Sequence, residues 1–120
     1  MTHRTAPLDV EFFDHEIETL PRERLQALQE AKLAAVIERV HGSNRFITEK
    51  LDTAGVAPGE IRTLGDLARL PFTTKAELLL AQEGASLSAN CTFPEAAYTR
   101  IHQTSGTTGA PLRVFDTAES

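Results

Sequence analysis

Cysteine is scarce in this sequence, since Cys91 is the single one among 120 residues. One thiol cannot form an internal disulfide, so the composition favours a reducing compartment, and we expect a cytoplasmic protein. No base or cation lies beside Cys91 in the sequence. We therefore interpret it as a small packed or exposed thiol rather than as a nucleophile.

An excess of positive charge is also lacking. The sequence has 12 Lys and Arg against 17 Asp and Glu, which gives a net charge of −5. General binding of nucleic acid needs a basic face that neutralises phosphates, so we expect no nucleic-acid partner. A local phosphate site is still compatible with this charge, because backbone N–H groups can bind an anion by themselves.

Long apolar runs are missing as well. The longest, 33–37 and 78–81, are far too short to cross a bilayer, so we expect no membrane partner. Residues 1–16 contain acids and lack the apolar stretch of a secretory signal. With 41% apolar and 24% charged residues the chain has the composition of a soluble globular protein, and its length fits one domain or part of one.

The sequence divides into three parts. Residues 1–20 predict an extended or irregular N-terminal arm with four apolar residues placed to pack against the body: Phe12, Phe13, Ile17 and Leu20. Residues 21–97 predict a helical region, and residues 98–120 predict a strand–loop–strand unit. The expected fold class is α+β, a mostly helical N-terminal region followed by a β-hairpin that carries a loop.

Apolar spacing predicts the first two helices. Residues that recur on one helical face after Pro21 indicate a helix that stops at Gly42. Ser43 is placed to cap a second helix, which we expect to end at Gly55.

Two pairs of residues three positions apart resemble capping boxes: Thr63 with Asp66, and Thr74 with Glu77. The first pair predicts a short helix after the Pro58-Gly59 turn, ended by Pro71. The second predicts a helix that ends near Gly84. Residues 85–97 are mostly small and polar and predict a loop.

The periodicity changes after residue 97. Residues 98–104 and 111–115 are typical of strands, and 105–110 form a loop between them. The run 104–111 reads Thr-Ser-Gly-Thr-Thr-Gly-Ala-Pro. Glycines permit positive φ and close approach, successive N–H groups can surround an anion, and hydroxyls can donate to phosphate oxygens. We interpret this run as a phosphate-binding loop, with a plain hairpin turn as the alternative.

Two well-known phosphate motifs do not fit this loop. A Walker A loop has four residues between its glycines and then Gly-Lys-Ser/Thr, whereas two residues separate Gly106 from Gly109 and Ala-Pro follows. The dinucleotide fingerprint fails because Gly-x-Gly is absent.

The loop, with Tyr98–Gln103 before it and Pro111 after it, resembles the phosphate-binding signature of the adenylate-forming superfamily, and most resembles the phenylacetate–CoA ligase branch. A second segment, Leu70-Pro71-Phe72-Thr73-Thr74-Lys75 followed by Glu77-Leu78, is similar to a segment of the same branch. The stretches 44–51 and 55–56 are also similar. The resemblance covers roughly residues 21–116, and it implies that the chain is part of the large N-terminal α/β domain of these ligases.

Members of this family join a carboxylic acid to coenzyme A through an acyl-adenylate made from ATP. The resemblance implies that six residues hold the β- and γ-phosphates of ATP while Mg²⁺ shares their charge: Thr104, Ser105, Gly106, Thr107, Thr108 and Gly109. It implies no catalytic residue and no metal ligand in this chain. The expected substrate is an aryl acid such as phenylacetate.

One position departs from the family pattern, because Ala110 stands where the family usually has Lys. Losing one charge-assisted hydrogen bond costs roughly 1.5–3 kcal/mol, and Mg²⁺ or Arg113 are the groups that could compensate. We interpret His102, just before the loop, as a strand histidine satisfied by a neighbour rather than as a phosphate ligand.

Family enzymes are several times longer than this chain, so we expect the chain alone to be inactive. It would be a fragment or one part of a split enzyme, partnered by the rest of the ligase, with a homodimer left open. A hairpin cut off from its sheet would expose apolar surface and self-associate. Two alternatives remain, namely a stand-alone phosphate- or nucleotide-binding module without catalysis, and a truncated helical interaction protein with a relic loop.

Overall fold

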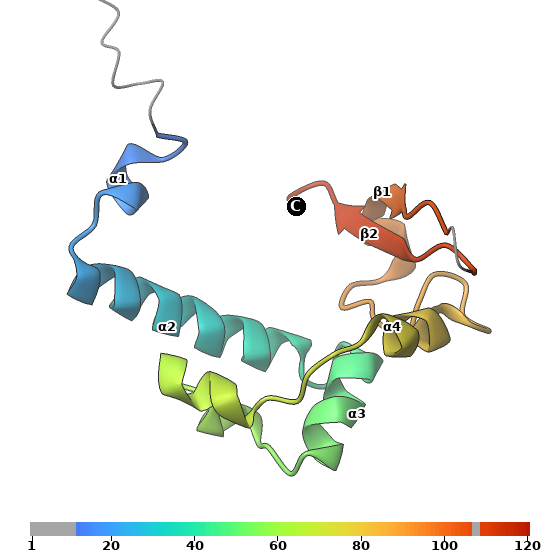
Figure 1. Cartoon of the computed structure of the whole chain (residues 1–120), viewed down its shortest axis with the longest axis horizontal. Helices are drawn as coiled ribbons and strands as arrows, with labels where there is room; N and C mark the ends of the chain where they lie inside the picture. The colour runs from blue at the N-terminus through green and yellow to red at the C-terminus, as the bar shows by residue number, and fades with distance from the viewer. Residues whose placement is uncertain (1–11, 107–108) are drawn as a thin grey trace, which may run out of the picture.

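The computed structural model describes residues 12–106 and 109–120 of the chain. Helices come first and an antiparallel hairpin last, which confirms the α+β class (Figure 1). The described elements follow in this order: α1 (His15–Glu18), α2 (Arg22–Val40), α3 (Arg45–Thr53), the 3-10 helices η2 (Pro58–Glu60) and η3 (Leu64–Arg69), α4 (Lys75–Gln82), the 3-10 helix η4 (Glu95–Ala97), β1 (Tyr98–Gln103) and β2 (Arg113–Thr117).

The N-terminal arm differs from its prediction. Residues 1–11 lie outside the described residues, and α1 forms a single helical turn where we expected irregular chain. Asp14 caps this turn by accepting a hydrogen bond from the N–H of Ile17 at 3.1 Å. Phe13 is fully exposed and Ile17 is also exposed, so the prediction that both pack against the body is wrong.

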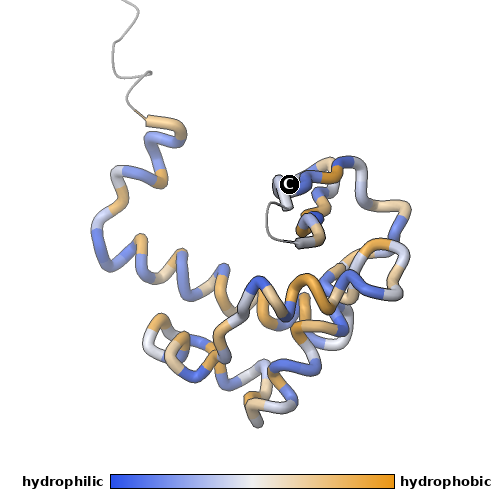
Figure 2. The backbone as a smooth tube through the Cα atoms, turned by 45° about the vertical axis from the view of Figure 1, so that its right-hand side comes forward, coloured by the Kyte–Doolittle hydropathy of each residue, from blue (hydrophilic) through white to orange (hydrophobic). Residues whose placement is uncertain are grey.

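A small core lies where α2 and α3 meet the chain that follows them. Four apolar residues are buried there: Ile37, Leu51, Val56 and Ile61. Three half-buried residues surround them: Leu33, Ile47 and Leu70. Figure 2 shows α2 as alternating hydrophilic and hydrophobic segments, as expected for a helix with one face on a core. Burial of each such side chain stabilises the fold by about 1.5–3 kcal/mol.

The start of α3 corrects one residue of the prediction. Asn44, not Ser43, is the N-cap, and its side-chain oxygen accepts from the N–H of Ile47 at 3.0 Å. Asn44 is buried, and its amide nitrogen also donates to Asn90 at 3.0 Å and Thr92 at 3.2 Å. Ser43 is exposed. The Asn44 side chain therefore both caps α3 and binds the loop 85–97.

Both predicted capping boxes are confirmed. The Asp66 carboxylate accepts from the backbone N–H groups of Thr63 at 2.8 Å and Arg62 at 2.9 Å, and these two bonds are the main reason that the pKa of Asp66 is lowered. At α4, the Thr74 hydroxyl accepts from the N–H of Glu77 at 3.3 Å, and Glu77 accepts from the N–H of Thr74 at 2.7 Å. The first box opens a 3-10 helix rather than an α-helix.

The segment 85–97 is a loop as predicted, apart from the single turn of η4, but it packs closely against the helices. Ala89 accepts from the N–H of Phe46 at 3.2 Å, and its own N–H donates to Ala81 at 2.7 Å. The Tyr98 hydroxyl accepts from the N–H groups of Thr92 at 2.9 Å and Phe93 at 3.1 Å. These bonds connect the helical region to the first residue of the hairpin.

The hairpin pairs β1 with β2 in antiparallel register, with His102 opposite Val114 and an irregularity between Tyr98 and Arg100. The second strand begins at Arg113, two residues later than predicted. An aromatic row supports one face of the hairpin, because the Tyr98 ring centroid lies 6.3 Å from that of Phe93 and 6.1 Å from that of Phe115. Such edge-on aromatic pairs favour a fixed side-chain geometry.

Candidate phosphate-binding loop

The candidate loop closes across its base between Thr104 and Leu112. The N–H of Thr104 donates to the carbonyl of Leu112 at 2.9 Å, and the N–H of Leu112 donates to the Thr104 hydroxyl at 2.9 Å. The Thr104 hydroxyl oxygen is thus held as an acceptor, while its own proton remains available for a further acceptor. The side chain that begins the motif also fixes the width of the loop.

Gly106 occupies a position that only glycine fits. Its φ is 62°, and a Cβ there would lie 2.9 Å from the carbonyl oxygen of Gly109 and 3.0 Å from the nitrogen of Pro111. Both obstacles are backbone atoms, so they cannot move aside as a flexible side chain would. The backbone at Gly106 therefore packs directly on the second half of the loop, residues 109–111, and this close approach is possible because Gly106 has no side chain.

The loop lies at the surface, with Ser105, Gly109 and Ala110 exposed. The N–H of Gly109 donates to the carbonyl of Gly106 at 3.3 Å. Two of the backbone N–H groups that could face an anion, those of Thr104 and Gly109, are thus already bonded within the hairpin. At these two residues, what remains for a bound phosphate is the hydroxyl of Thr104 and the turn that Gly109 helps to form.

Of the six residues that the resemblance assigns to the phosphates, Thr104, Ser105, Gly106 and Gly109 are described and lie together in the connection between β1 and β2, at the turn end of the hairpin. Thr107 and Thr108 lie outside the described residues. Their role stays a prediction.

Gln82 was missed by the sequence analysis. Gln82 is the last residue of α4, and its side-chain Nε2 donates to the carbonyl of Pro111 at 3.0 Å. Its Oε1 accepts from the N–H of Arg113 at 3.1 Å. A glutamine near a helix end gives no sequence signal for such a contact, because the partner backbone is about thirty residues away.

The polar side chains beside the loop are satisfied within the hairpin. His102 Nε2 lies 2.8 Å from Asp116 Oδ2 on the neighbouring strand, which confirms that His102 has a protein partner. The Arg113 guanidinium carbon lies 6.0 Å from the ring centroid of Phe115, two residues farther from the loop. That placement does not support Arg113 as a replacement for the Lys usually found at position 110.

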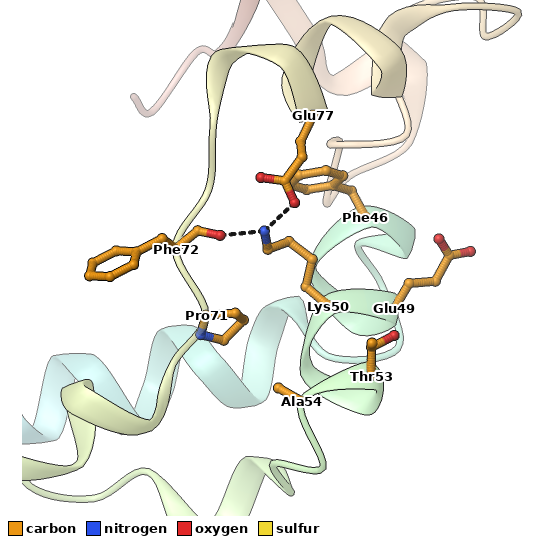
Figure 3. Close-up of a pocket in the computed structure, with 8 residues that line it drawn as sticks. All are labelled: Phe46, Glu49, Lys50, Thr53, Ala54, Pro71, Phe72 and Glu77. Atoms are coloured by element: carbon orange, nitrogen blue, oxygen red, sulfur yellow. Dashed lines mark hydrogen bonds and ion pairs between the residues drawn. The ribbon is translucent and has the colours of Figure 1, made fainter.

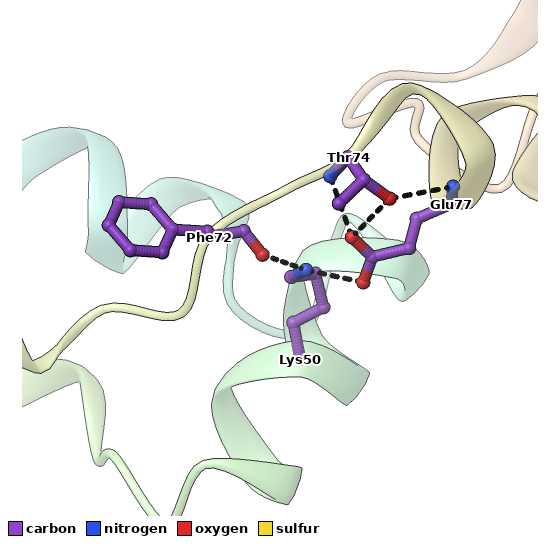
Figure 4. Close-up of polar contacts among 4 residues, drawn as sticks. All are labelled: Lys50, Phe72, Thr74 and Glu77. Carbon is purple, nitrogen blue, oxygen red and sulfur yellow. Dashed lines mark hydrogen bonds and ion pairs between the residues drawn. The ribbon is translucent and has the colours of Figure 1, made fainter.

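Three residues of the second resembling segment, Pro71, Phe72 and Glu77, line an open pocket of about 490 Å³ between α3 and α4 (Figure 3). Lys50 points into it from α3 and donates to Glu77 Oε1 at 2.7 Å and to the Phe72 carbonyl at 2.5 Å (Figure 4). The Lys50 ammonium, with help from the N–H and hydroxyl of Thr74, lowers the pKa of Glu77 to about 2. All polar groups of this cluster are paired with each other, so we interpret it as a structural connection between helices.

Within residues 12–106 and 109–120 no group of three His, Cys, Asp or Glu is arranged to hold a metal ion. No helix in the same described ranges has the length and apolar character needed to cross a membrane. Lys75 of the second resembling segment is exposed.

No family model matches the chain. Three curated relatives do, and each is named phenylacetate–coenzyme A ligase. The chain is 40% identical over 102 residues to the protein from Thermus thermophilus, 36% over 98 residues to that from Escherichia coli, and 31% over 98 residues to that from Aromatoleum evansii. These alignments cover 82–85% of the chain but only 21–22% of each relative. The chain therefore spans about a fifth of the length of the relatives it matches.

Solved structures of a CoA ligase have the same fold as this chain. The fold superposes on 2-hydroxyisobutyryl-CoA ligase in complex with 2-HIB-AMP and CoA with a TM-score of 0.76 and 25% identity, over 83% of this chain and 21% of that one. An open conformation of the same ligase gives a TM-score of 0.75 at 22% identity. The helical region followed by a loop-bearing hairpin is thus the N-terminal architecture of an acyl-CoA ligase. The chain belongs to the adenylate-forming ligases, in the phenylacetate–CoA ligase branch, and matches the N-terminal portion of these proteins.

Proposed function

We propose that the chain is the ATP-phosphate-holding part of an acid–CoA ligase, which activates a carboxylic acid as acyl-AMP and transfers the acyl group to coenzyme A. An aryl acid such as phenylacetate is the proposed substrate, because the curated relatives carry that name. The observation that carries the proposal is Gly106, which has a positive φ and a Cβ position blocked by the backbone of Gly109 and Pro111, so that the surface loop keeps a tight turn that only glycine allows.

In the proposed reaction the carboxylate attacks the α-phosphorus of ATP and pyrophosphate leaves. The loop residues 104–109 position the β- and γ-phosphates and stabilise the charge that develops on the leaving group. Thr104 and Ser105 donate hydroxyl hydrogen bonds, and Gly106 and Gly109 supply the turn. This part of the enzyme positions the nucleotide and contributes no nucleophile or base.

Mg²⁺ does not fit the described residues by themselves, because they contain no group of acidic ligands placed for a metal. We assign no Mg²⁺ ligand and no coenzyme A contact to this chain. The acid, coenzyme A and the remaining ATP contacts are proposed to be bound by the rest of the ligase, either in one polypeptide or in a split-enzyme partner. A cytoplasmic location is part of the proposal and is supported by the single cysteine.

Exposed apolar residues support the proposal that another part of the ligase packs against this chain. Ile101 and Val114 on the hairpin are exposed, as are Leu80 on α4 and Phe72 just before that helix. A two-stranded hairpin is marginal alone in water, so we propose that further strands and helices of the same ligase cover this surface. The division into an arm (1–20), a helical region (21–97) and a hairpin unit (98–120) remains part of the proposal.

The test is acid-dependent exchange of labelled pyrophosphate into ATP by the complete natural gene product, assayed with a panel of aryl and fatty acids. Exchange that requires an aryl acid supports both the reaction and the substrate class. Exchange with fatty acids only would reject the aryl acid and keep the reaction. Absence of exchange with every acid, together with measurable pyrophosphate binding, would favour the phosphate-binding module instead.

A further inference from the structure

Gln82 contacts the loop in a way that imitates a neighbouring strand. In an antiparallel pair the backbone groups of alternate residues point toward the partner strand and away from it. Leu112, just before β2, bonds to Thr104, just after β1, because its N–H donates to the Thr104 hydroxyl and its carbonyl accepts from the Thr104 N–H. The carbonyl of Pro111 and the N–H of Arg113 therefore point away from β1, to the outer edge of the second strand. These are the two groups that the Gln82 amide binds, one as donor and one as acceptor.

Through Pro111, Gln82 is connected to the turn at Gly106. Pro111 is one of the two residues whose backbone blocks a Cβ at Gly106, with its nitrogen 3.0 Å and its Cα 3.2 Å from that position. Movement of Pro111 would therefore open or close the space at Gly106. Proline has no N–H, so its carbonyl is the one backbone hydrogen-bonding group by which Pro111 can be held.

Helix α4 is itself held firmly at its other end. Glu77, near its N-terminus, is bonded to Lys50 of α3 and to the N–H of Thr74. Gln82 is half-buried and ends the helix. The short helix thus forms a rigid link from the helical core to the second half of the loop.

We propose that Gln82 is a positioning residue for the phosphate loop. It holds Pro111 against Gly106, so that the loop has the geometry for phosphate before the ligand arrives. This inference rests on the proposed function, and it adds a residue outside the motif that acts on ATP phosphates through the loop rather than by contact with them. A preorganised loop binds more tightly because less ordering is needed on binding.

Two variants separate the contacts of Gln82. Gln82→Met has a similar length and loses both hydrogen bonds. Gln82→Glu retains an acceptor for the N–H of Arg113 but places an oxygen without a proton against the carbonyl of Pro111. Gln29→Met is the matched control, because Gln29 is an exposed glutamine in the middle of α2. All are made in the complete natural gene product.

We expect both Gln82 variants to raise the KM for ATP and the Kd for pyrophosphate by about tenfold, the effect of one or two lost hydrogen bonds. The KM for the acid and the melting temperature should change little, and Gln29→Met should match the wild type. Hydrogen exchange gives a readout independent of activity, because the Arg113 amide should be protected in the wild type and Gln82→Glu and lose protection in Gln82→Met.

Three outcomes overturn the inference. Pyrophosphate affinity unchanged in both variants would show that the loop needs no support from Gln82. A parallel rise in the KM values for ATP and for the acid, accompanied by a fall in melting temperature, would make Gln82 a general structural residue. A wild-type protein that binds neither ATP nor pyrophosphate would overturn the proposed function as well, whereas the first two outcomes leave that function standing.

Discussion

Lys50 Nζ lies 2.7 Å from Glu77 Oε1 and joins the middle of α3 to the first turn of α4 (Figure 4). The Lys50 side chain is only 14% exposed, whereas that of Glu77 is 39% exposed, so one partner is sheltered and the other is partly hydrated. Glu77 also completes the capping box with Thr74. The Glu77 carboxylate therefore caps the start of α4 and also binds that helix to α3.

Glu77 makes stability depend on pH in a defined range. Its pKa is lowered from 4.5 to about 2, chiefly by Lys50, so the folded state holds its proton more weakly than the unfolded state. The stabilisation is complete above about pH 4.5 and is lost as the pH falls toward 2. We expect Glu77→Gln to melt at a lower temperature than wild type at neutral pH, and the difference to shrink between pH 4.5 and 2.

Melting temperatures measured across that range check this prediction. Glu49→Gln is the control, because Glu49 is an exposed carboxylate that lines the same pocket without an ion pair to Lys50. A constant difference between Glu77→Gln and wild type over the whole range would contradict the assignment.

Asn44 should be far more sensitive to truncation than its neighbour. Asn44→Ala removes the N-cap of α3, worth about 1 kcal/mol, and also the bonds to Asn90 and Thr92 at a buried position. We expect a loss of about 2–3 kcal/mol in the free energy of unfolding, measured by urea denaturation. Ser43→Ala should change it by less than about 0.5 kcal/mol. Equal effects of the two substitutions would restore Ser43 as the cap.

Ile61 carries the clearest prediction for the core, because its side chain is 0% exposed. Ile61→Ala should lower the free energy of unfolding by about 2–5 kcal/mol through lost burial and a residual cavity. Leu80→Ala, at a residue that is 64% exposed, should cost less than about 0.5 kcal/mol in the same chain. Denaturation midpoints with an unchanged slope would show that both variants keep the native fold.

Gly106→Ala should disturb the loop without unfolding the protein. The added Cβ would meet backbone atoms of Gly109 and Pro111 in a turn with positive φ, so we expect pyrophosphate binding to weaken at least about tenfold. Gly59→Ala is the matched control, since Gly59 has open space around its Cβ position. Titration calorimetry with pyrophosphate measures both. Unchanged binding in Gly106→Ala would remove the physical basis of the assigned loop.

Ala110→Lys tests the departure from the family pattern. Ala110 is exposed beside Gly109, so a lysine there should reach bound phosphate and tighten pyrophosphate binding by about tenfold or more. The gain should fall with added salt because it is electrostatic. Ala118→Lys adds the same charge at an exposed residue beyond β2 and should have little effect. An equal gain in both variants would indicate nonspecific charge rather than a site at position 110.

Several features could be predicted from the sequence because their causes lie within a few residues. The Thr74–Glu77 capping box, the stop of α2 before Gly42 and the two strands around the glycine-rich loop were all predicted from residues close together in the chain. Turn and cap chemistry depends on local dihedral angles and nearby backbone groups, so the pattern itself contains the information. The family resemblance rested on the same local runs.

Other features were decided only by tertiary structure. Asn44 rather than Ser43 caps α3 because a loop some 46 residues away supplies the partners of its side chain. Gln82 reaches Pro111, and Lys50 reaches Glu77, across comparable stretches of chain. Many side chains along a sequence could make such bonds, and only the packing of helices and hairpin selects the few that do. The sequence alone thus determined where the elements and the loop lie, whereas the fold decided which distant side chains hold them in place.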